Sequence, residues 1–311
     1  MRMLDRKEEQ ERREFILKEL RKKNLALFYK DFSIDHRLWL RELTDKYKER
    51  GLLPLSPLIL ADYYKEYEDK LLAVLVACIL LDDNERVMEQ VSAMRKILGE
   101  HPYKDFYSNR TFVQLSNGAN QTKYIAYFRS TKYYEISKLF DIIWNIEHDY
   151  GKKMFEVFFE TITLKEYTPY NALLLLLRDF PVGRPEWRVN LALLRLCDKK
   201  GISEPLWDLG CLDEKLECPL SKEIKDYLNT WFFEWSRTFT FKEVCAILGF
   251  EREIDVYYSM LAFRELSRYK PKEVKDYLKL YYTQFKNGTL GLRGRKKLKA
   301  RMPKIEFEHS K

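Results

Sequence analysis

The sequence has no long apolar run. No stretch reaches the roughly 18 residues that a membrane-spanning helix needs, and the longest candidates, Leu71–Leu81 and Ala172–Leu177, have the length of buried helices. The first fifteen residues, MRMLDRKEEQERREF, contain none of the apolar segment that a signal peptide requires. We therefore expect a soluble protein that has no membrane partner and lies in the cytoplasm.

Residues that bind metals are also scarce, with four histidines and five cysteines among 311 residues. Two histidines have a carboxylate at helical spacing, His101 with Asp105 and His309 with Glu306. Neither pair has a third ligand nearby, although a protein metal site takes three or four. The cysteines lack the close spacing of an iron–sulfur loop and are expected to be reduced thiols. We predict no metal site and no cofactor.

The common catalytic motifs are missing. The chain contains no G-x-x-x-x-G-K-S/T phosphate loop, no G-x-G-x-x-G dinucleotide loop, no H-E-x-x-H and no G-x-S-x-G. These absences argue against a phosphate-loop nucleotidase, a Rossmann dehydrogenase, a zinc protease of that class and an α/β-hydrolase. Signals for strands are weak, and no repeat with a period of 20–50 residues is present.

Helical periodicity dominates what is there. Hydrophobic residues make up 46% of the chain and aromatic residues 15%, enough for a large core. Apolar residues recur at the spacing of amphipathic helices, so the fold class is predicted to be all-α. The predicted helices span about residues 5–23, 34–50, 69–81, 85–98, 120–128, 132–148, 152–163, 169–179, 187–199, 220–233, 241–249, 254–269 and 271–286. Residues 101–120 are predicted to form a loop.

The basic charge is concentrated near the C-terminal end. Residues 286–304 hold eight basic residues and no acid, which equals the formal net charge of +8 for the whole chain. Such a patch suits a phosphate backbone, but a solvated tail or a tail bound to an acidic partner has the same composition. We divide the sequence into a charged N-terminal helical extension (1–33), a helical body with the option of two interleaved lobes (34–285) and a basic tail (286–311).

Several segments resemble a known family. Residues 56–59 read Ser-Pro-Leu-Ile, an apolar helix follows Asp69, and Pro102-Tyr103 forms a second turn. Further segments read WRVNLALLRLCDKKG, CPLSKEIKDYL and DVYYSMLAF. Together they cover about residues 38–270 and resemble an uncharacterised bacterial family distantly related to the helix-hairpin-helix (HhH-GPD) DNA glycosylases of the endonuclease III type. The resemblance implies a two-lobed helical globule that binds DNA.

The chain departs from that family where catalysis would occur. Ser221 stands where active glycosylases have an aspartate, and Glu223 stands at the histidine that follows it. A hydroxyl carries no negative charge to stabilise the positive charge that develops on the sugar. The phosphate-binding hairpin is reduced to a remnant at residues 180–184. Ser221 after Pro219 also suits a helix N-cap. An active enzyme with a rearranged acid, Glu223 or Asp226, stays as the alternative, and it requires a buried carboxylate with a raised pKa near Ser221.

The sequence thus favours a DNA-binding protein without enzymatic activity. A third hypothesis is an interaction protein whose N-terminal helix binds a protein partner or a second copy. Arg188 and Arg195, seven residues apart on one predicted helix, suit either phosphates or structural ion pairs. The residues expected to bind nucleic acid are Arg184, Arg188, Arg293, Arg295, Lys296, Lys297, Lys299 and Arg301.

Overall fold

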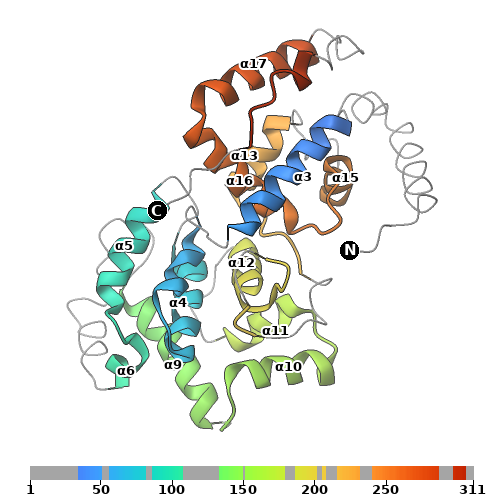
Figure 1. The fold of residues 1–311 in the computed structure, drawn as a ribbon. Helices are drawn as coiled ribbons and strands as arrows, with labels where there is room; N and C mark the ends of the chain where they lie inside the picture. Colours follow the sequence, from blue (N-terminus) through green and yellow to red (C-terminus); the bar gives the residue numbers. More distant parts are fainter. Residues whose placement is uncertain are drawn as a thin grey trace. The chain divides into compact units, whose positions relative to one another are not determined.

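The computed structural model describes residues 34–50, 56–81, 86–107, 133–149, 151–178, 186–201, 205–207, 216–231, 240–286 and 297–305. Every regular element within these ranges is a helix, and no strand is present among them (Figure 1). The prediction of an all-α protein is confirmed. None of the described helices combines the length and the apolar character that would be needed to span a bilayer.

The chain divides into two compact units. Unit 1 consists of residues 1–46 and 231–311, so that both ends of the chain belong to it, and unit 2 consists of residues 47–230. The boundaries predicted from the sequence lie at residues 33 and 286. This division instead falls near the end of one helix, α3 (Ile34–Glu49), and at the last residue of another, α13 (Lys222–Trp231).

Unit 2 is built around the apolar helix α4 (Tyr67–Leu80). Every residue of α4 from Leu71 onward is buried, as expected for a helix that is apolar on all sides. It packs against the 3₁₀-helix η1 (Pro57–Tyr63) and against α6 (Pro102–Tyr107), α9 (Tyr133–Asp149) and α12 (Glu186–Cys197). The sequence predicted this buried helix, two residues shorter at its start.

The other helices of unit 2 follow the chain around this centre. Helix α5 (Val87–Leu98) packs on η1, and α10 (Met154–Lys165) contacts both α9 and α11 (Pro169–Leu176). Helix α11 in turn contacts α12. The last element, α13 (Lys222–Trp231), ends at the boundary with unit 1. The predicted helices of this region are confirmed within a few residues, except 120–128, which lies outside the described residues.

The loop predicted for residues 101–120 is wrong for its first part, because Pro102–Tyr107 forms α6. Proline is well suited to the first turn of a helix, where its missing N–H has no partner to lose. Phe106 anchors this short helix by stacking on Phe140 of α9, with ring centroids 3.9 Å apart. The two residues of this contact are far apart in the sequence, so the local periodicity of apolar residues cannot predict it.

Unit 1 contains most of α3 (Ile34–Glu49) together with α15 (Phe241–Leu248), α16 (Asp255–Tyr269) and α17 (Pro271–Lys286). Helices α16 and α17 pack against each other. Thr240 caps α15 as predicted, because its Oγ1 accepts a hydrogen bond from the N–H of Glu243. Gly249 ends α15 in the left-handed conformation (φ 82°) and its carbonyl accepts a hydrogen bond from Arg41 of α3.

Candidate functional site

Ser221 has a structural role. It is buried directly before α13, and its Oγ accepts a hydrogen bond of 3.3 Å from the N–H of Ile224. This is the geometry of a helix N-cap, so the capping role predicted from the sequence is confirmed. Glu223 is half-buried and Asp226 is exposed. Neither is the buried carboxylate that a rearranged acid beside Ser221 would require.

The two arginines of α12 are buried and serve the fold of unit 2. Arg188 donates hydrogen bonds to the carbonyl oxygens of Ile79 and Leu81, at 2.9 and 2.6 Å. It thereby satisfies carbonyl groups that the C-terminal end of α4 leaves without partners inside the helix. Arg195 forms an ion pair of 2.8 Å with Asp62. Arg188 is only 5% exposed and therefore has little surface to offer a phosphate, and Arg195 makes the structural ion pair.

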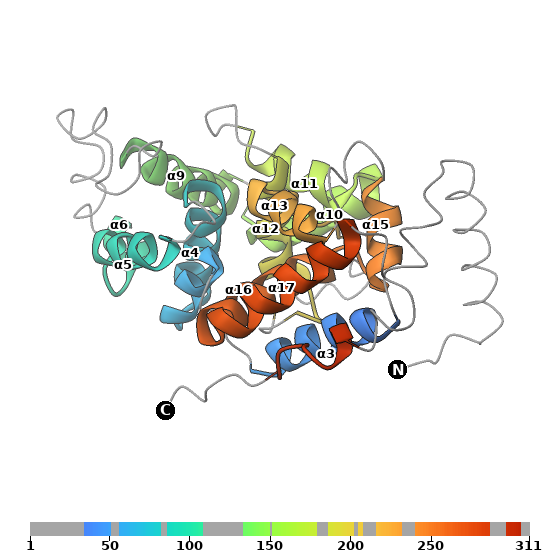
Figure 2. The same cartoon turned by 90° about the horizontal axis from the view of Figure 1, so that it is seen from above.

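The basic residues near the C-terminal end are part of a folded segment where the structure describes them. Leu298 is buried, and the carbonyl of Pro303 accepts a hydrogen bond of 3.0 Å from the indole of Trp39 in α3. Lys270, at the end of α16, donates to the carbonyl of Lys304 at 3.1 Å. Residues 297–305 thus run along α3 (Figure 2) and are not a free tail.

This anchoring leaves basic side chains in solvent. Lys297 and Arg301 are exposed. The ammonium of Lys299 lies 2.8 Å from Asp35, with 65% of the lysine side chain exposed, and ion pairs this open contribute about 1 kcal/mol at most. Phosphate can therefore compete for Lys299. The other predicted contacts, Arg184, Arg293, Arg295 and Lys296, lie outside the described residues.

An aromatic cluster holds α3 to α17 beneath this segment. His36 is fully enclosed, with ring centroids 4.8 Å from Trp231, 5.4 Å from Tyr281, 5.7 Å from Tyr277 and 6.0 Å from Trp39. The hydroxyl of Tyr277 lies 3.1 Å from Nδ1 of the histidine. Burial lowers the pKa of His36 to about 3, because the charged imidazolium would lose its hydration. His36 is therefore a neutral core residue.

Charge is divided unequally between the two units. Unit 1 contains 31 basic and 20 acidic residues, a net charge of +11, whereas unit 2 contains 25 basic and 28 acidic residues, a net charge of −3. The basic segment of residues 286–304 supplies +8 of the net charge of unit 1, and the other residues of unit 1 add +3. The net positive charge of the protein thus belongs to unit 1.

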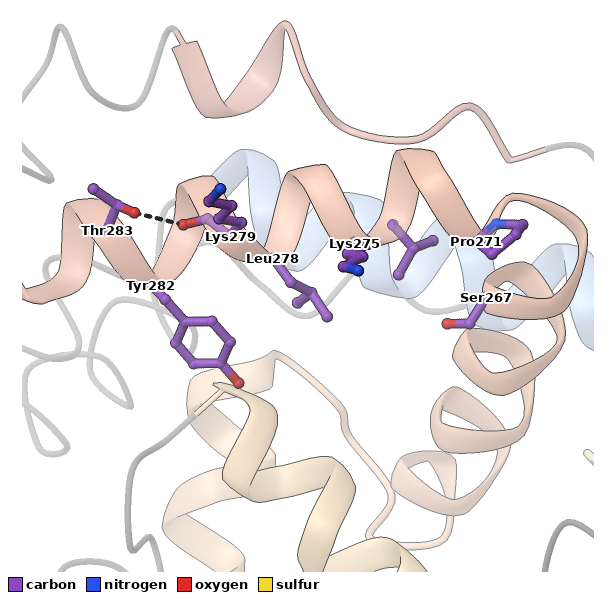
Figure 3. A pocket seen from close by; sticks show the side chains of 8 residues that line it. Ser267, Pro271, Lys275, Leu278, Lys279, Tyr282 and Thr283 are labelled. Atoms are coloured by element: carbon purple, nitrogen blue, oxygen red, sulfur yellow. Dashed lines mark hydrogen bonds between the residues drawn. The ribbon is translucent and has the colours of Figure 1, made fainter.

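Unit 1 also has an open hollow along α17, with a volume of about 660 Å³. Its lining comes from one stripe of this helix and from Ser267 of α16 (Figure 3). The apolar part is Pro271, Val274, Leu278 and the ring of Tyr282, and the basic part is Lys275 and Lys279. This combination of an apolar floor with ammonium groups suits a ligand that has both a flat apolar part and negative charge.

Unit 2 holds a network of titratable groups that joins the ends of four helices. The hydroxyl of Tyr103 donates to Glu147 at 2.6 Å, and its N–H donates to Asp69 at 2.8 Å. Lys153 lies 3.4 Å from Glu147 and 2.8 Å from Glu68. Burial raises the pKa of Asp69, whereas the hydrogen bond between Glu68 and Lys153 lowers the pKa of the glutamate and raises that of the lysine.

Raised carboxyl pKa values are common at active sites, but structural networks produce them too. Here each contact fixes the end of one helix on another: α4 through Asp69 and Glu68, α6 through Tyr103, α9 through Glu147 and α10 through its N-cap, Lys153. We assign the network a structural role in unit 2.

The described residues contain no group of three or more metal-ligating side chains. The helical pair of His101 with Asp105 noted in the sequence is not the contact that forms, since Nδ1 of His101 lies 3.7 Å from Asp69. The four described cysteines, Cys78, Cys197, Cys218 and Cys245, are buried, and none of the four is in a disulfide.

No protein-family model, no curated protein and no solved structure matches the chain.

Sequence reasoning missed the hollow along α17. Its signal is present in the sequence, because Lys275, Lys279 and Tyr282 are spaced by four and three residues and so share one face of a helix. The charge signal of this helix is weaker than that of residues 286–304, because the acids Glu273 and Asp276 offset its lysines.

Proposed function

We propose that the protein binds nucleic acid through unit 1. The partition of charge carries this proposal, since unit 1 holds a net +11 while unit 2 is slightly acidic. Neutralising phosphates releases condensed counterions, and this gain drives binding of any sequence. Excess charge that served only to keep the protein soluble would not have to be concentrated on one unit.

The residues proposed to contact phosphates are Lys297, Lys299 and Arg301. They lie on a segment that Leu298, Trp39 and Lys270 hold in place, so little conformational entropy of the backbone is lost on binding. Arg293, Arg295, Lys296 and Arg184 stay within the proposal from their sequence alone. Arg188 is left out, because it is buried and bonded to backbone carbonyls.

We propose further that the chain is a non-catalytic member of the helix-hairpin-helix DNA glycosylase superfamily. The likeness of the sequence segments supports this relationship, and the capping role of Ser221 agrees with the loss of the catalytic aspartate. DNA is accordingly the first ligand to test. We propose the cytoplasm as its location, in keeping with the absence of a disulfide among the four described cysteines.

The experiment is fluorescence anisotropy of the full chain with labelled duplex DNA and labelled single-stranded DNA, each at low and at high salt. We expect binding to both at low salt and a steep loss of affinity as salt rises. An absence of binding to either DNA at low salt would overturn the proposal and would favour binding of a protein partner by residues 1–33.

A further inference from the structure

We propose that the hollow along α17 binds single-stranded nucleic acid, with one unstacked base lying on the ring of Tyr282. This inference rests on the proposed function, which it deepens by naming a site and a preferred form of the ligand. It does not involve Lys297, Lys299 or Arg301, so that the two proposals can be tested apart.

The lining of the hollow suits a base. Leu278 and Tyr282 point to the same side of α17, and Ser267 faces that space from α16 (Figure 3). With Pro271 and Val274 these residues give an apolar surface beside an opening to solvent. The volume of about 660 Å³ leaves room for a nucleobase together with its sugar. The hydroxyl of Ser267 donates to the carbonyl of Phe263 and so lies on the hollow without an unmet donor.

Tyr282 provides the stacking platform. Tyr282 is 43% exposed, whereas Tyr257, Tyr258, Tyr277 and Tyr281 of the same unit are buried. Its neighbour Tyr281 is turned into the core, where its hydroxyl donates to the carbonyl of Trp231 at 2.9 Å. That anchor fixes the backbone at this point of α17 and holds the ring of Tyr282 on the outer face. A base stacked on an aromatic side chain contributes about 1–3 kcal/mol to binding.

Lys275 and Lys279 provide the contacts to the backbone of the strand. Both are exposed and lie one helical turn apart on the stripe that ends at Tyr282. Within the described part of the chain, the ammonium groups of Lys275 and Lys279 form no ion pair with a carboxylate. The two ammonium groups can bind successive phosphates of a strand. The base that lies between those two phosphates in the strand can then stack on the aromatic ring.

The geometry favours a single strand over a duplex, because a paired base is already stacked on its neighbours and cannot enter a hollow. It also favours nucleic acid over an acidic amphipathic peptide. A peptide helix would bury an apolar face over most of its length, whereas here Lys275, Lys279 and Thr283 interrupt the apolar lining. Binding of an acidic peptide in place of nucleic acid is one outcome of the test.

The test uses the full chain with a single-stranded oligo-dT and a hairpin duplex of equal charge, both labelled for anisotropy. The variants are Tyr282→Ala, Tyr282→Trp and Lys275→Ala/Lys279→Ala. Matched controls are Tyr269→Ala, which removes another exposed tyrosine of the unit, and Lys242→Ala, which removes an exposed lysine outside the hollow. Circular dichroism confirms that each variant is folded.

We expect Tyr282→Ala to weaken binding of the single strand at least about five-fold and Tyr282→Trp to keep it, since tryptophan also stacks. The double lysine variant should lower the slope of log affinity against log salt for the single strand by about 1.4. The hairpin duplex and both controls should change little. Photo-crosslinking of an oligonucleotide carrying 5-iodo-deoxyuridine should label a peptide of α17.

The inference is overturned if Tyr282→Ala binds the single strand like the wild type while the protein still binds DNA; the proposed function then survives and the hollow is not the site. It is also overturned if an acidic peptide binds to the hollow and oligo-dT does not compete. A wild type that binds neither DNA contradicts both proposals together.

Discussion

The indole nitrogen of Trp39 donates a hydrogen bond of 3.0 Å to the carbonyl oxygen of Pro303, across 264 positions of the sequence. The same indole lies edge-on to His36, in the aromatic cluster that also contains Tyr277. The segment that presents Lys297 and Arg301 is therefore tied to the core of unit 1. Stability of that core and presentation of the basic side chains are linked through one tryptophan.

Trp39→Phe removes this hydrogen bond and keeps most of the aromatic packing. We expect the free energy of unfolding to fall by about 1–3 kcal/mol, because a buried carbonyl loses its donor. DNA affinity should fall several-fold, since the basic segment is then held less firmly. Denaturant unfolding and anisotropy measure the two effects. Trp144→Phe, at a half-buried tryptophan of α9, is the control. Equal DNA affinity for the wild type, Trp39→Phe and Trp144→Phe would contradict the link between core stability and presentation of the basic side chains.

His36 makes stability depend on pH. Its pKa in the folded protein is about 3, below the ordinary value of 6.5, so the unfolded chain takes up a proton that the folded protein does not. The stability that the neutral ring provides is present above pH 6.5 and is lost as pH falls toward 3. Between about pH 7.5 and 5 this loss is about 2 kcal/mol.

The check is a set of urea unfolding curves across that pH range for the wild type, His36→Phe and His148→Gln, the last at an exposed histidine. The variant at position 36 should lose most of the pH dependence between pH 7.5 and 5, and the control should retain it. A wild type whose stability is flat over this range would show that His36 is not buried as described.

Ser221→Ala tests whether the residue at the expected aspartate position serves the fold alone. The variant loses the N-cap of α13 and should be destabilised by about 0.5–2 kcal/mol. Its DNA affinity should equal that of the wild type. Ser92→Ala, at an exposed serine within α5, serves as the control and should be neutral in stability. A large loss of DNA binding by a fully folded Ser221→Ala would place Ser221 in a binding site instead.

Arg188→Met distinguishes a structural arginine from one that contacts phosphate. The change leaves the carbonyl oxygens of Ile79 and Leu81 without their donor, and we expect a loss of about 2–4 kcal/mol in stability. Thermal or urea unfolding measures it. Below the unfolding transition the variant should bind DNA normally. A stable variant with weakened DNA binding would instead restore Arg188 to the binding residues.

The sequence predicts the helices well because their signals are local. The apolar run of α4, the cap at Thr240 and the spacing in α16 each lie within a few residues of the element that they specify. Helix α6 was missed because its anchor is a stacking contact between Phe106 and Phe140, 34 positions apart. Local periodicity carries no information on such a contact.

The candidate site was predicted less well for a similar reason. Charge in the sequence is the basis on which Lys297 and Arg301 are predicted, but charge alone cannot show that Arg188 is buried against the end of α4 or that Pro303 is bound by Trp39. Those outcomes depend on which helices meet. The unequal division of charge depends on residues 1–46 and 231–311 belonging to one unit. That assignment is likewise a property of the folded chain.

Salt-dependent DNA binding by two charge-reversal variants tests the central claim most directly. Lys297→Glu/Arg301→Glu changes two exposed residues of unit 1, and Lys65→Glu/Lys96→Glu changes two exposed residues of unit 2 by the same net charge. For the unit 1 variant we predict weaker duplex binding and a slope of log affinity against log salt lower by about 2, with the unit 2 variant close to the wild type. Equal losses in both variants, or none in either, would contradict binding through unit 1.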